Sequence, residues 1–229
     1  LEYQICEILN PTNCAIATVT INVADNNAPV IPTLADITGE CSATATAPTA
    51  EDNCAGTITA TTTDPLTYTT QGTFVITWTF DDGNGNISTA TQNVIVDDVT
   101  PPAAPILSSV TGECSATVTA VPTATDNCSG TITGTTTDAL TYNTQGTHTI
   151  TWSFDDGNGN VSTATQTVVV DDVTAPVAPV IATVTGECSA SVTAPVATDN
   201  CVGTVTGTTT DALTYNTQGT YTVTWTFND

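Results

Sequence analysis

Apolar and polar residues alternate with a period of two along most of the chain. The longest alternating runs cover residues 147–154 and 161–170, and related runs recur earlier and later in the sequence. Thr and Val dominate these runs, Gly, Pro, Asn and Asp separate them, and no segment has helical spacing. This pattern is typical of half-buried β-strands. The sequence therefore predicts an all-β fold built from β-sandwiches.

The alternating pattern itself recurs about every 74 residues. The motif Thr-Gly-Glu-Cys begins at Thr38, Thr111 and Thr185, and a tryptophan stands at positions 78, 152 and 225. Self-similarity at a fixed period indicates an array of similar modules. We predict repeat 1 at residues 29–101, repeat 2 at residues 102–175 and repeat 3 at residues 176–229.

Within repeat 2, the alternation predicts a series of short strands. We expect them at residues 106–110, 115–121, 130–137, within 138–146, at 147–154 and at 161–170, with a loop at 122–128. Ile150, Trp152 and Phe154 share one face of the strand at 147–154, because side chains two positions apart point the same way. We expect this face, and its copies in the other repeats, to line the core.

The two ends of the chain do not fit the repeat. Residues 1–28 are expected to form the closing hairpin of a preceding domain, followed by a linker. Repeat 3 stops after its tryptophan run, before its last strand, which predicts a window from a longer array. As an alternative, residues 1–23 supply that strand to another copy. No signal-peptide or membrane-length apolar pattern occurs, so we expect a soluble segment whose export signal, if it has one, lies elsewhere.

The charge of the chain is entirely acidic. Among 229 residues there are 23 Asp and Glu, no Lys or Arg and one His, for a formal net charge of −23. Nucleic acid and anionic membranes are poor partners, because both need basic side chains to neutralise phosphate. Disorder is disfavoured by a hydrophobic content of 39% and by the β-branched composition. We expect neither nucleic-acid binding nor direct membrane insertion.

Eight cysteines form an even set of four close pairs. Their spacing lacks the Cys-x-x-Cys pattern of zinc sites, which favours disulfides and an oxidising, extracellular location. Each short loop would be stabilised by about 2–3 kcal/mol in the chain-entropy model. The expected pairs are Cys6–Cys14, Cys41–Cys54, Cys114–Cys128 and Cys188–Cys201.

Acidic residues cluster at the predicted junctions between repeats. In a sandwich, the loop before 130, the loop after the tryptophan strand and the incoming linker should meet at one pole. Two carboxylates about 5 Å apart repel by about 3 kcal/mol at an effective dielectric near 20. A calcium ion with six to eight oxygen ligands would relieve this repulsion. The candidate ligands are Asp25, Asn27, Asp52, Asp81 and Asp82 at the first junction, Asp97, Asp98, Asp126, Asp155 and Asp156 at the second, and Asp171, Asp172, Asp199, Asn228 and Asp229 at the third.

Ordinary turn chemistry is the alternative explanation of these clusters, because Asp-Gly and Asn-Gly pairs favour hairpin turns. It explains the residues around Gly83 but not the doubled Asp of the linkers at 97–98 and 171–172.

An enzyme is not expected. His148 is the only histidine, Phe74 and Tyr221 occupy its equivalent positions, and no nucleophile–base set is present. The paired carboxylates are neighbours in sequence, unlike those of a glycosidase.

The order of motifs resembles the hyalin-repeat (HYR) module, an immunoglobulin-like extracellular domain. The resemblance rests on the Pro-Pro start, Gly-Glu-Cys-Ser-Ala-Thr-Val, Ala-Thr-Asp-Asn-Cys-Ser-Gly and Asp-Asp-Gly-Asn-Gly-Asn, and it covers residues 29–229. It implies adhesion or matrix roles without catalysis. The near-identical copies look like those of giant surface adhesins of gliding Bacteroidetes. Repeat 1 and the linker before it depart from the pattern, with Ala24 where the other copies have Asp97 and Asp171, and Glu51 where they have Thr125 and Thr198.

Together these features predict a cell-surface stalk, an extended rod of repeats held by disulfides and interdomain calcium. Its main partners would be neighbouring repeats of the same chain. Two alternatives are a module that binds glycans or another surface, and a filament subunit that assembles with other copies by strand exchange.

Overall fold

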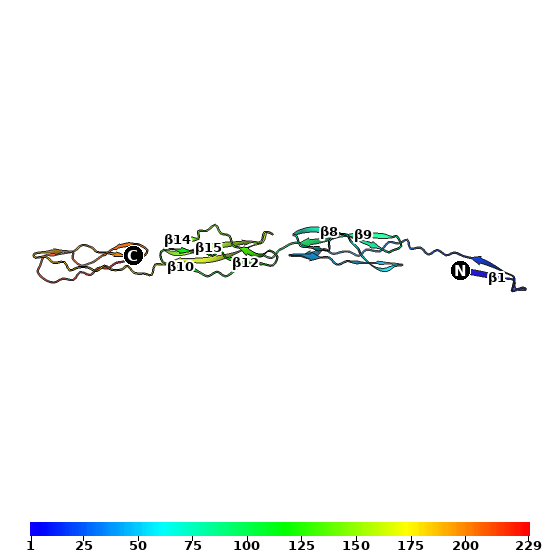
Figure 1. Ribbon diagram of the computed structural model, residues 1–229, viewed down its shortest axis with the longest axis horizontal. Coiled ribbons are helices and arrows are strands. Elements are labelled where there is room, and N and C mark those ends of the chain that lie inside the picture. Colours follow the sequence, from blue (N-terminus) through cyan, green and yellow to red (C-terminus); the bar gives the residue numbers. More distant parts are fainter. The chain divides into compact units, whose positions relative to one another are not determined.

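The computed structural model describes residues 1–229 and separates into two compact units, Leu1–Val99 and Thr100–Asp229. Both contain only strands, turns and extended segments (Figure 1), so the all-β prediction is confirmed. The chain has no helix that is long and apolar enough to cross a membrane.

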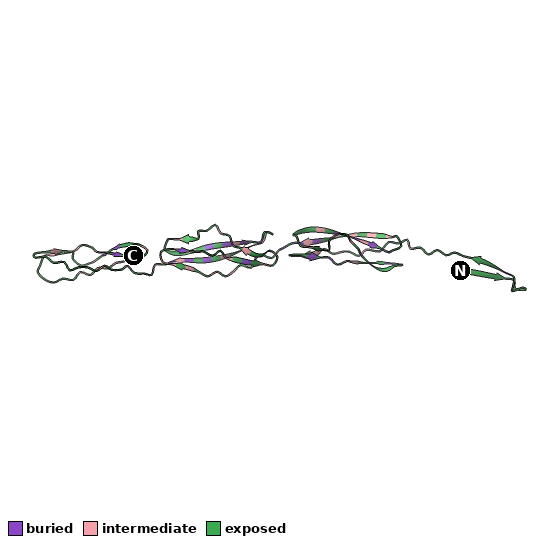
Figure 2. Ribbon diagram, viewed as in Figure 1, coloured by how far each residue is buried: buried purple, intermediate pink, exposed green.

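The first unit begins with a hairpin. Strands β1 (Glu2–Cys6) and β2 (Cys14–Thr18) pair antiparallel, and the Cys6–Cys14 disulfide closes the hairpin at its turn. Both strands are exposed along their length apart from half-buried Cys14 (Figure 2). The apolar side chains at positions 16, 19 and 21 are 63%, 46% and 62% exposed. The hairpin and its disulfide were predicted correctly, but the hairpin has no core of its own.

Repeats 1 and 2 share one strand topology. The first unit continues with β3 (Ile37–Gly39), β4 (Ala43–Thr44), β5 (Thr49–Asp52), β6 (Gly56–Thr59), β7 (Thr67–Tyr68), β8 (Gly72–Asp81) and β9 (Ile87–Val96). The second unit begins with β10 (Val110–Gly112), β11 (Ala116–Thr117), β12 (Thr123–Asp126), β13 (Gly130–Thr133), β14 (Thr141–Tyr142), β15 (Gly146–Asp155) and β16 (Val161–Val170).

In repeats 1 and 2 the last strand lies at the centre of a three-stranded sheet. Strand β16 pairs antiparallel with β15 and parallel with β10, in the order β10-β16-β15, and repeat 1 has the order β3-β9-β8. Two-stranded sheets β11-β14 and β12-β13 complete repeat 2, as β4-β7 and β5-β6 complete repeat 1. Because β16 holds both of its neighbours, the sheet depends on it.

The core of repeat 2 lies between these sheets. Ile150, Trp152 and Phe154 are 0%, 2% and 0% exposed, as the alternation predicted. They form one cluster with Val168 and Val170 of β16 and with small residues of β11 and β12. The indole Nε1 of Trp152 donates to Oε1 of Gln166 at 3.1 Å, and Gln166 Nε2 donates to the Ser108 carbonyl at 3.1 Å. The one polar group of the buried indole is therefore satisfied.

We expect Gln166→Leu to destabilise the second unit by about 1–3 kcal/mol, the cost of leaving a buried donor without a partner. The substitution also leaves the Ser108 carbonyl without its hydrogen-bond donor, so the loss of stability should exceed that of the exposed control Gln4→Leu. Urea unfolding followed by tryptophan fluorescence measures the difference. Equal unfolding midpoints for the two variants would contradict a structural role for this hydrogen bond.

Repeat 3 is less complete than the other two. It contains β17 (Ala190–Ser191), β18 (Val196–Thr198), β19 (Thr204–Thr206) and β20 (Thr214–Tyr215). No strand is formed at 184–186 or 219–228, the positions equivalent to β10 and β15. Trp225 is half-buried, whereas its equivalents in repeats 1 and 2 are buried. The expected tryptophan strand is absent because no equivalent of β16 stands between these two segments.

One segment predicted as a loop is a strand. Residues 123–126 form β12, which pairs with β13 from Thr123↔Thr133 to Asp126↔Gly130. Ala124 faces the core and is 2% exposed. The Asp and Asn residues suggested a longer loop, but the turn itself is confined to the residues after Asp126.

The predicted disulfide pairs within repeats are wrong. Cys114 is bonded to Cys201, and Cys54 and Cys188 are free. Cys41 and Cys128 also take part in disulfides. Only Cys6–Cys14 was predicted correctly.

The reason is that the two cysteines of a repeat lie at opposite ends of it. Cys114 follows Gly112, which pairs with Val170 at the end of β16. The turn that carries Cys128 lies at the beginning of β16, since Ser129 Oγ donates to the Asp156 carbonyl at 3.0 Å and Asp155 pairs with Val161. The ten residues of β16 span about 30 Å in extended form. A disulfide requires Cα atoms within about 7 Å.

Candidate functional site

Three carboxylates from distant parts of the first unit meet at one end of repeat 1. Asp25 comes from the linker, Asp52 from the end of β5 and Asp82 from the turn after β8. One oxygen of each lies within 4.8 Å of the others. The expected meeting of two loops and the incoming linker therefore occurs here.

The turns hold two of these carboxylates rigidly. Asp52 Oδ1 accepts hydrogen bonds from the backbone N–H groups of Cys54 and Ala55, both at 2.8 Å. Asp82 Oδ1 accepts from the backbone N–H groups of Asn84 and Asn86 at 2.8 and 3.0 Å, and its Oδ2 accepts from Asn86 Nδ2 at 2.6 Å. Asp52 and Asp82 are 8% and 9% exposed. Both side chains are fixed before any ligand arrives.

The second oxygen of Asp52 has no partner. Oδ2 of Asp52 is buried and makes no hydrogen bond. A buried carboxylate oxygen without a donor costs free energy, and the chain has no Lys or Arg to supply one. A cation at the cluster would give this oxygen a partner.

The linker carboxylate is held by the opposite turn. Asn84 Nδ2 donates to Asp25 Oδ2 at 3.3 Å, and Asn86 Nδ2 donates to the Asp25 carbonyl at 3.2 Å. The backbone N–H of Asn27 donates to Asp25 Oδ1 at 3.2 Å, so Asn27 orients this carboxylate. Asp81 accepts from the N–H of Gly83 at 2.9 Å and lies outside the group of three. Asp25, Asp52 and Asp82 are thus the predicted ligands that the structure brings together.

Hydrogen bonds set the protonation of Asp82. Burial raises the pKa of this carboxyl, but hydrogen bonds from the Asn86 side chain and from the backbone N–H groups of Asn84 and Asn86 outweigh burial and lower the pKa below its usual value. Asp82 is therefore charged at neutral pH, beside two further carboxylates. The same hydrogen-bonding pattern lowers the pKa of Asp156 in repeat 2.

We expect Asp82 to make the first unit acid-sensitive. A carboxyl whose pKa is lower in the folded than in the unfolded state contributes stability that is full above the unfolded pKa, about 4, and is lost as pH falls through the folded pKa. Thermal melting in a chelator, from about pH 6 down to about pH 2, should show this loss, and Asp82→Asn should reduce it. An identical acid profile for the variant would contradict the assignment.

Repeat 2 carries the same pair of turns within the second unit. Asp126 Oδ1 accepts from the N–H groups of Cys128 and Ser129 at 2.8 and 2.7 Å, and its buried Oδ2 has no partner. Asp155 accepts from the N–H of Gly157 at 2.9 Å, as its counterpart Asp81 does from Gly83. Asp97 and Asp98 lie in the first unit, where the Asp98 N–H donates to Gln71 Oε1 at 2.9 Å. Their place in a site with Asp126 stays a prediction.

At the third junction, Asp172 and Asp199 lie together beside Cys201, with one atom of each within 4.8 Å of the others. Asp199 Oδ1 accepts from the N–H groups of Cys201 and Val202 at 2.7 and 2.8 Å, and its buried Oδ2 has no partner. Backbone hydrogen bonds, first from Val202 and Cys201, lower the pKa of Asp199. The other predicted ligands, Asp171, Asn228 and Asp229, are exposed and lie outside this group.

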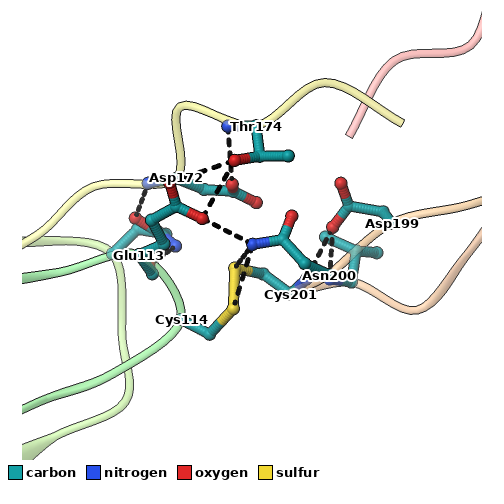
Figure 3. Close-up of a disulfide and its surroundings, with 9 residues drawn as sticks. Glu113, Cys114, Asp172, Thr174, Asp199, Asn200 and Cys201 are labelled. Carbon is teal, nitrogen blue, oxygen red and sulfur yellow. Dashed lines mark hydrogen bonds between the residues drawn. A yellow bond between two sulfur atoms is a disulfide. The ribbon is translucent and has the colours of Figure 1, made fainter. Parts of the chain in front are cut away.

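A disulfide crosses this third junction (Figure 3). Cys114, from the Gly-Glu-Cys turn of repeat 2, bonds Cys201, from the Asp-Asn-Cys turn of repeat 3. An added Cβ at Gly112 would lie 2.0 Å from the Ser115 carbonyl oxygen, so only glycine permits the tight turn that presents Cys114. The bond therefore joins consecutive repeats by way of two turns that recur in every repeat.

Glu113 belongs to the same junction, although the sequence did not single it out. Its carboxylate accepts from Thr174 Oγ1 at 3.0 Å and from Asn200 Nδ2 at 2.7 Å (Figure 3). It thereby connects repeat 2 to the linker and to repeat 3. The sequence does carry a signal for it, because a glutamate precedes the first cysteine of all three repeats, at Glu40, Glu113 and Glu187.

Comparison with known families agrees with the motif order. Residues 102–170 match the family described as the HYR-like domain with 4 cysteines. This stretch covers repeat 2 from its Pro-Ala start to the end of β16. The match supports an HYR-like module at repeat 2.

The chain is also similar to a curated protein. It is 32% identical over 220 residues to "Hyalin" of Strongylocentrotus purpuratus, an alignment that covers 83% of this chain and 18% of hyalin. The chain thus spans less than a fifth of the length of that relative.

Proposed function

We propose that this chain is a structural, non-enzymatic segment of an extracellular adhesin, a stalk of HYR modules that holds a more distant binding region away from the cell. The family match and the similarity to hyalin support the module and the adhesion-type class. The disulfides support an oxidising location outside the cytoplasm. A surface adhesin of gliding Bacteroidetes is the specific context that we propose.

The observation that carries this proposal is the Cys114–Cys201 bond. A stalk must keep neighbouring modules aligned under load, and a linker alone leaves them free to turn. A covalent bond beside the linker gives the junction between repeats 2 and 3 a second connection. Two connections limit bending more than one does, which suits a mechanical role.

We further propose that calcium stiffens the junctions. Asp25, Asp52 and Asp82 supply three carboxylates, one with a buried unpartnered oxygen, and a hard divalent cation would satisfy them. Calcium tolerates the irregular geometry of linker and turn oxygens, whereas magnesium requires a near-ideal octahedron. Because Asp25 is on the linker and the other two are on the repeat, the ion would lock the linker onto the repeat.

The glycan-binding alternative has little support in the repeats. Sugar rings stack on exposed aromatic faces, but Trp78 and Trp152 are only 1% and 2% exposed. Their role is in the core.

Small-angle scattering of the whole chain tests the stalk proposal. In millimolar calcium we expect an extended particle with one well-defined maximum dimension, and in excess chelator a broader distribution of lengths. Distributions that do not change between the two conditions would contradict calcium stiffening. A compact particle in calcium would contradict the stalk itself.

A further inference from the structure

Two turns of the chain carry an asparagine followed by a glycine. They are Asn84-Gly85 after β8 and Asn158-Gly159 after β15, and both pairs are exposed. Gly85 and Gly159 have φ angles of 104° and 107°, a region that favours glycine. Asparagine is among the chemically labile residues. Because glycine has no side chain to shield its backbone nitrogen, this nitrogen can reach the amide carbon of the preceding asparagine side chain and displace its ammonia.

The amide of Asn84 lies against a carboxylate of the candidate cation site. Its Nδ2 donates to Oδ2 of Asp25 at 3.3 Å, and Asp25 forms the group of three carboxylates with Asp52 and Asp82. The chain has no Lys or Arg that could take the place of this donor. The chemical state of residue 84 therefore decides whether Asp25 faces a hydrogen-bond donor or another negative charge.

The folded turn restrains the nitrogen that would attack. Burial raises the pKa of Asp82, but hydrogen bonds from the Asn86 side chain and from backbone N–H groups, that of Gly85 among them, outweigh burial and lower the pKa. Asp82 Oδ1 also accepts from the N–H of Asn84 at 2.8 Å. The Gly85 nitrogen is therefore engaged while the turn is closed, and the reaction proceeds from molecules in which this exposed turn has opened locally.

We propose that Asn84 is a site of spontaneous deamidation, and that the aspartate formed there makes the linker more dependent on a bound divalent cation. The backbone nitrogen of Gly85 loses its proton to hydroxide and attacks Cγ of Asn84, and Nδ2 takes up a proton and leaves as ammonia. Water then opens the succinimide ring. Attack at Cγ gives aspartate, and attack at the main-chain carbonyl gives isoaspartate. The net reaction consumes one water, releases one ammonia and needs no oxidant or reductant.

Deamidation replaces a hydrogen-bond donor with a negative charge. The new carboxylate of residue 84 would face Asp25 where Nδ2 now donates, so the group of three carboxylates would become four. Without a cation, these like charges repel and weaken the hold of the turn on the linker. With calcium, the fourth carboxylate strengthens binding, because the number of charged ligands tunes the affinity of such sites. This consequence rests on the calcium site proposed above, whereas the deamidation itself is independent of it.

Peptide mapping of the whole chain tests the modification. The folded protein is kept at mildly alkaline pH in a chelator, sampled over time and digested with a protease that cleaves at acidic residues. We expect residue 84 to change from amide to acid about tenfold faster than Asn13, an exposed asparagine that is followed by cysteine, because only a following glycine leaves the nitrogen uncovered. Equal rates at the two positions would overturn the proposal.

Asn84→Gln is the matched control for the chemistry. It keeps the amide donor, but its longer side chain must close a larger ring, so the peptides that contain residue 84 should keep their mass. If they gained acid in this variant at the rate of the parent, the reaction would lie at another residue. Asn158 in the second unit should convert in parent and variant alike, which confirms that the incubation conditions are the same.

Asn84→Asp contains the product from the start and tests its effect on the cation. Melting of the first unit at increasing calcium concentrations gives the affinity of its site. We expect Asn84→Asp to bind calcium about tenfold more tightly than the parent, and to melt at a lower temperature than the parent in excess chelator. Asn13→Asp adds the same charge to the same unit on the exposed hairpin turn, and it should match the parent in both conditions.

The two parts of the proposal fail separately. If Asn84→Asp and Asn13→Asp responded alike to calcium, residue 84 would have no part in the cation site. If the parent showed no response to calcium, the calcium proposal would be wrong, and the effect of the new aspartate on it would be wrong as well. The mass measurement would still decide whether Asn84 deamidates.

Discussion

Replacing Cys114 with serine is expected to destabilise the second unit by about 4 kcal/mol. Cys114 and Cys201 are separated by 87 positions, and in the chain-entropy model a loop of this size restricts the unfolded chain more than a loop of about 15 residues, which is worth about 3 kcal/mol. The loss should be concentrated in repeat 3, which has no three-stranded sheet of its own. Urea unfolding of oxidised protein, followed by tryptophan fluorescence, measures it.

The control for this variant is Cys54→Ser, which removes an exposed cysteine that forms no disulfide in the structure. It should leave the free energy of unfolding within about 0.5 kcal/mol of the parent, as substitutions away from structural features usually do. If Cys114→Ser and Cys54→Ser had the same free energy of unfolding, the disulfide between the repeats would contribute nothing to stability.

Calcium is expected to raise the melting temperature of the first unit by about 10 °C or more. At a calcium concentration a hundred times the dissociation constant, binding adds about 2.7 kcal/mol to the folded state. For a domain of about 100 residues, each kcal/mol corresponds to about 4–8 °C. Asp52→Asn should abolish most of this shift, because the amide oxygen stays with the two backbone N–H groups of the turn and an NH2 group, which cannot bind a cation, replaces the unpartnered Oδ2. Calorimetry with and without calcium measures both.

Asp52→Asn is a mild substitution in every other respect. An asparagine Oδ1 can still accept the two backbone hydrogen bonds that fix the turn. Glu7→Gln removes the same charge from the same unit on the exposed hairpin turn, and it should keep the full calcium response. If calcium still raised the melting temperature of Asp52→Asn, the ion would bind elsewhere. If calcium did not raise the melting temperature of the parent, the acidic clusters would serve only to form turns.

The sequence predicts most strands but not the connections between repeats. Ile150, Trp152 and Phe154 alternate with polar residues, and period-two alternation follows directly from strand geometry. The pairing of Cys114 has no such local signal. Closeness in sequence suggested Cys128, but β16 separates the two cysteines by its whole length. Disulfide partners depend on which pole each turn occupies, and that requires the topology.

The residues of the candidate site were likewise predicted only in part. Asp25, Asp52 and Asp82 were predicted together, because loops and linkers meet at a sandwich pole. Doubled Asp motifs cannot show which member points inward, so Asp81 was included although it caps its own turn. Glu113 was missed because its partners, Thr174 and Asn200, lie 61 and 87 positions away.

The most direct test is a disulfide map of the oxidised chain by mass spectrometry. Trypsin has no site in a chain without Lys or Arg, so the digestion needs a protease that cleaves at acidic residues. We expect a cross-linked pair of peptides containing Cys114 and Cys201, with Cys6 joined to Cys14. A peptide pair joining Cys114 to Cys128 would contradict the bond between repeats, and with it the stalk whose neighbouring modules are covalently aligned.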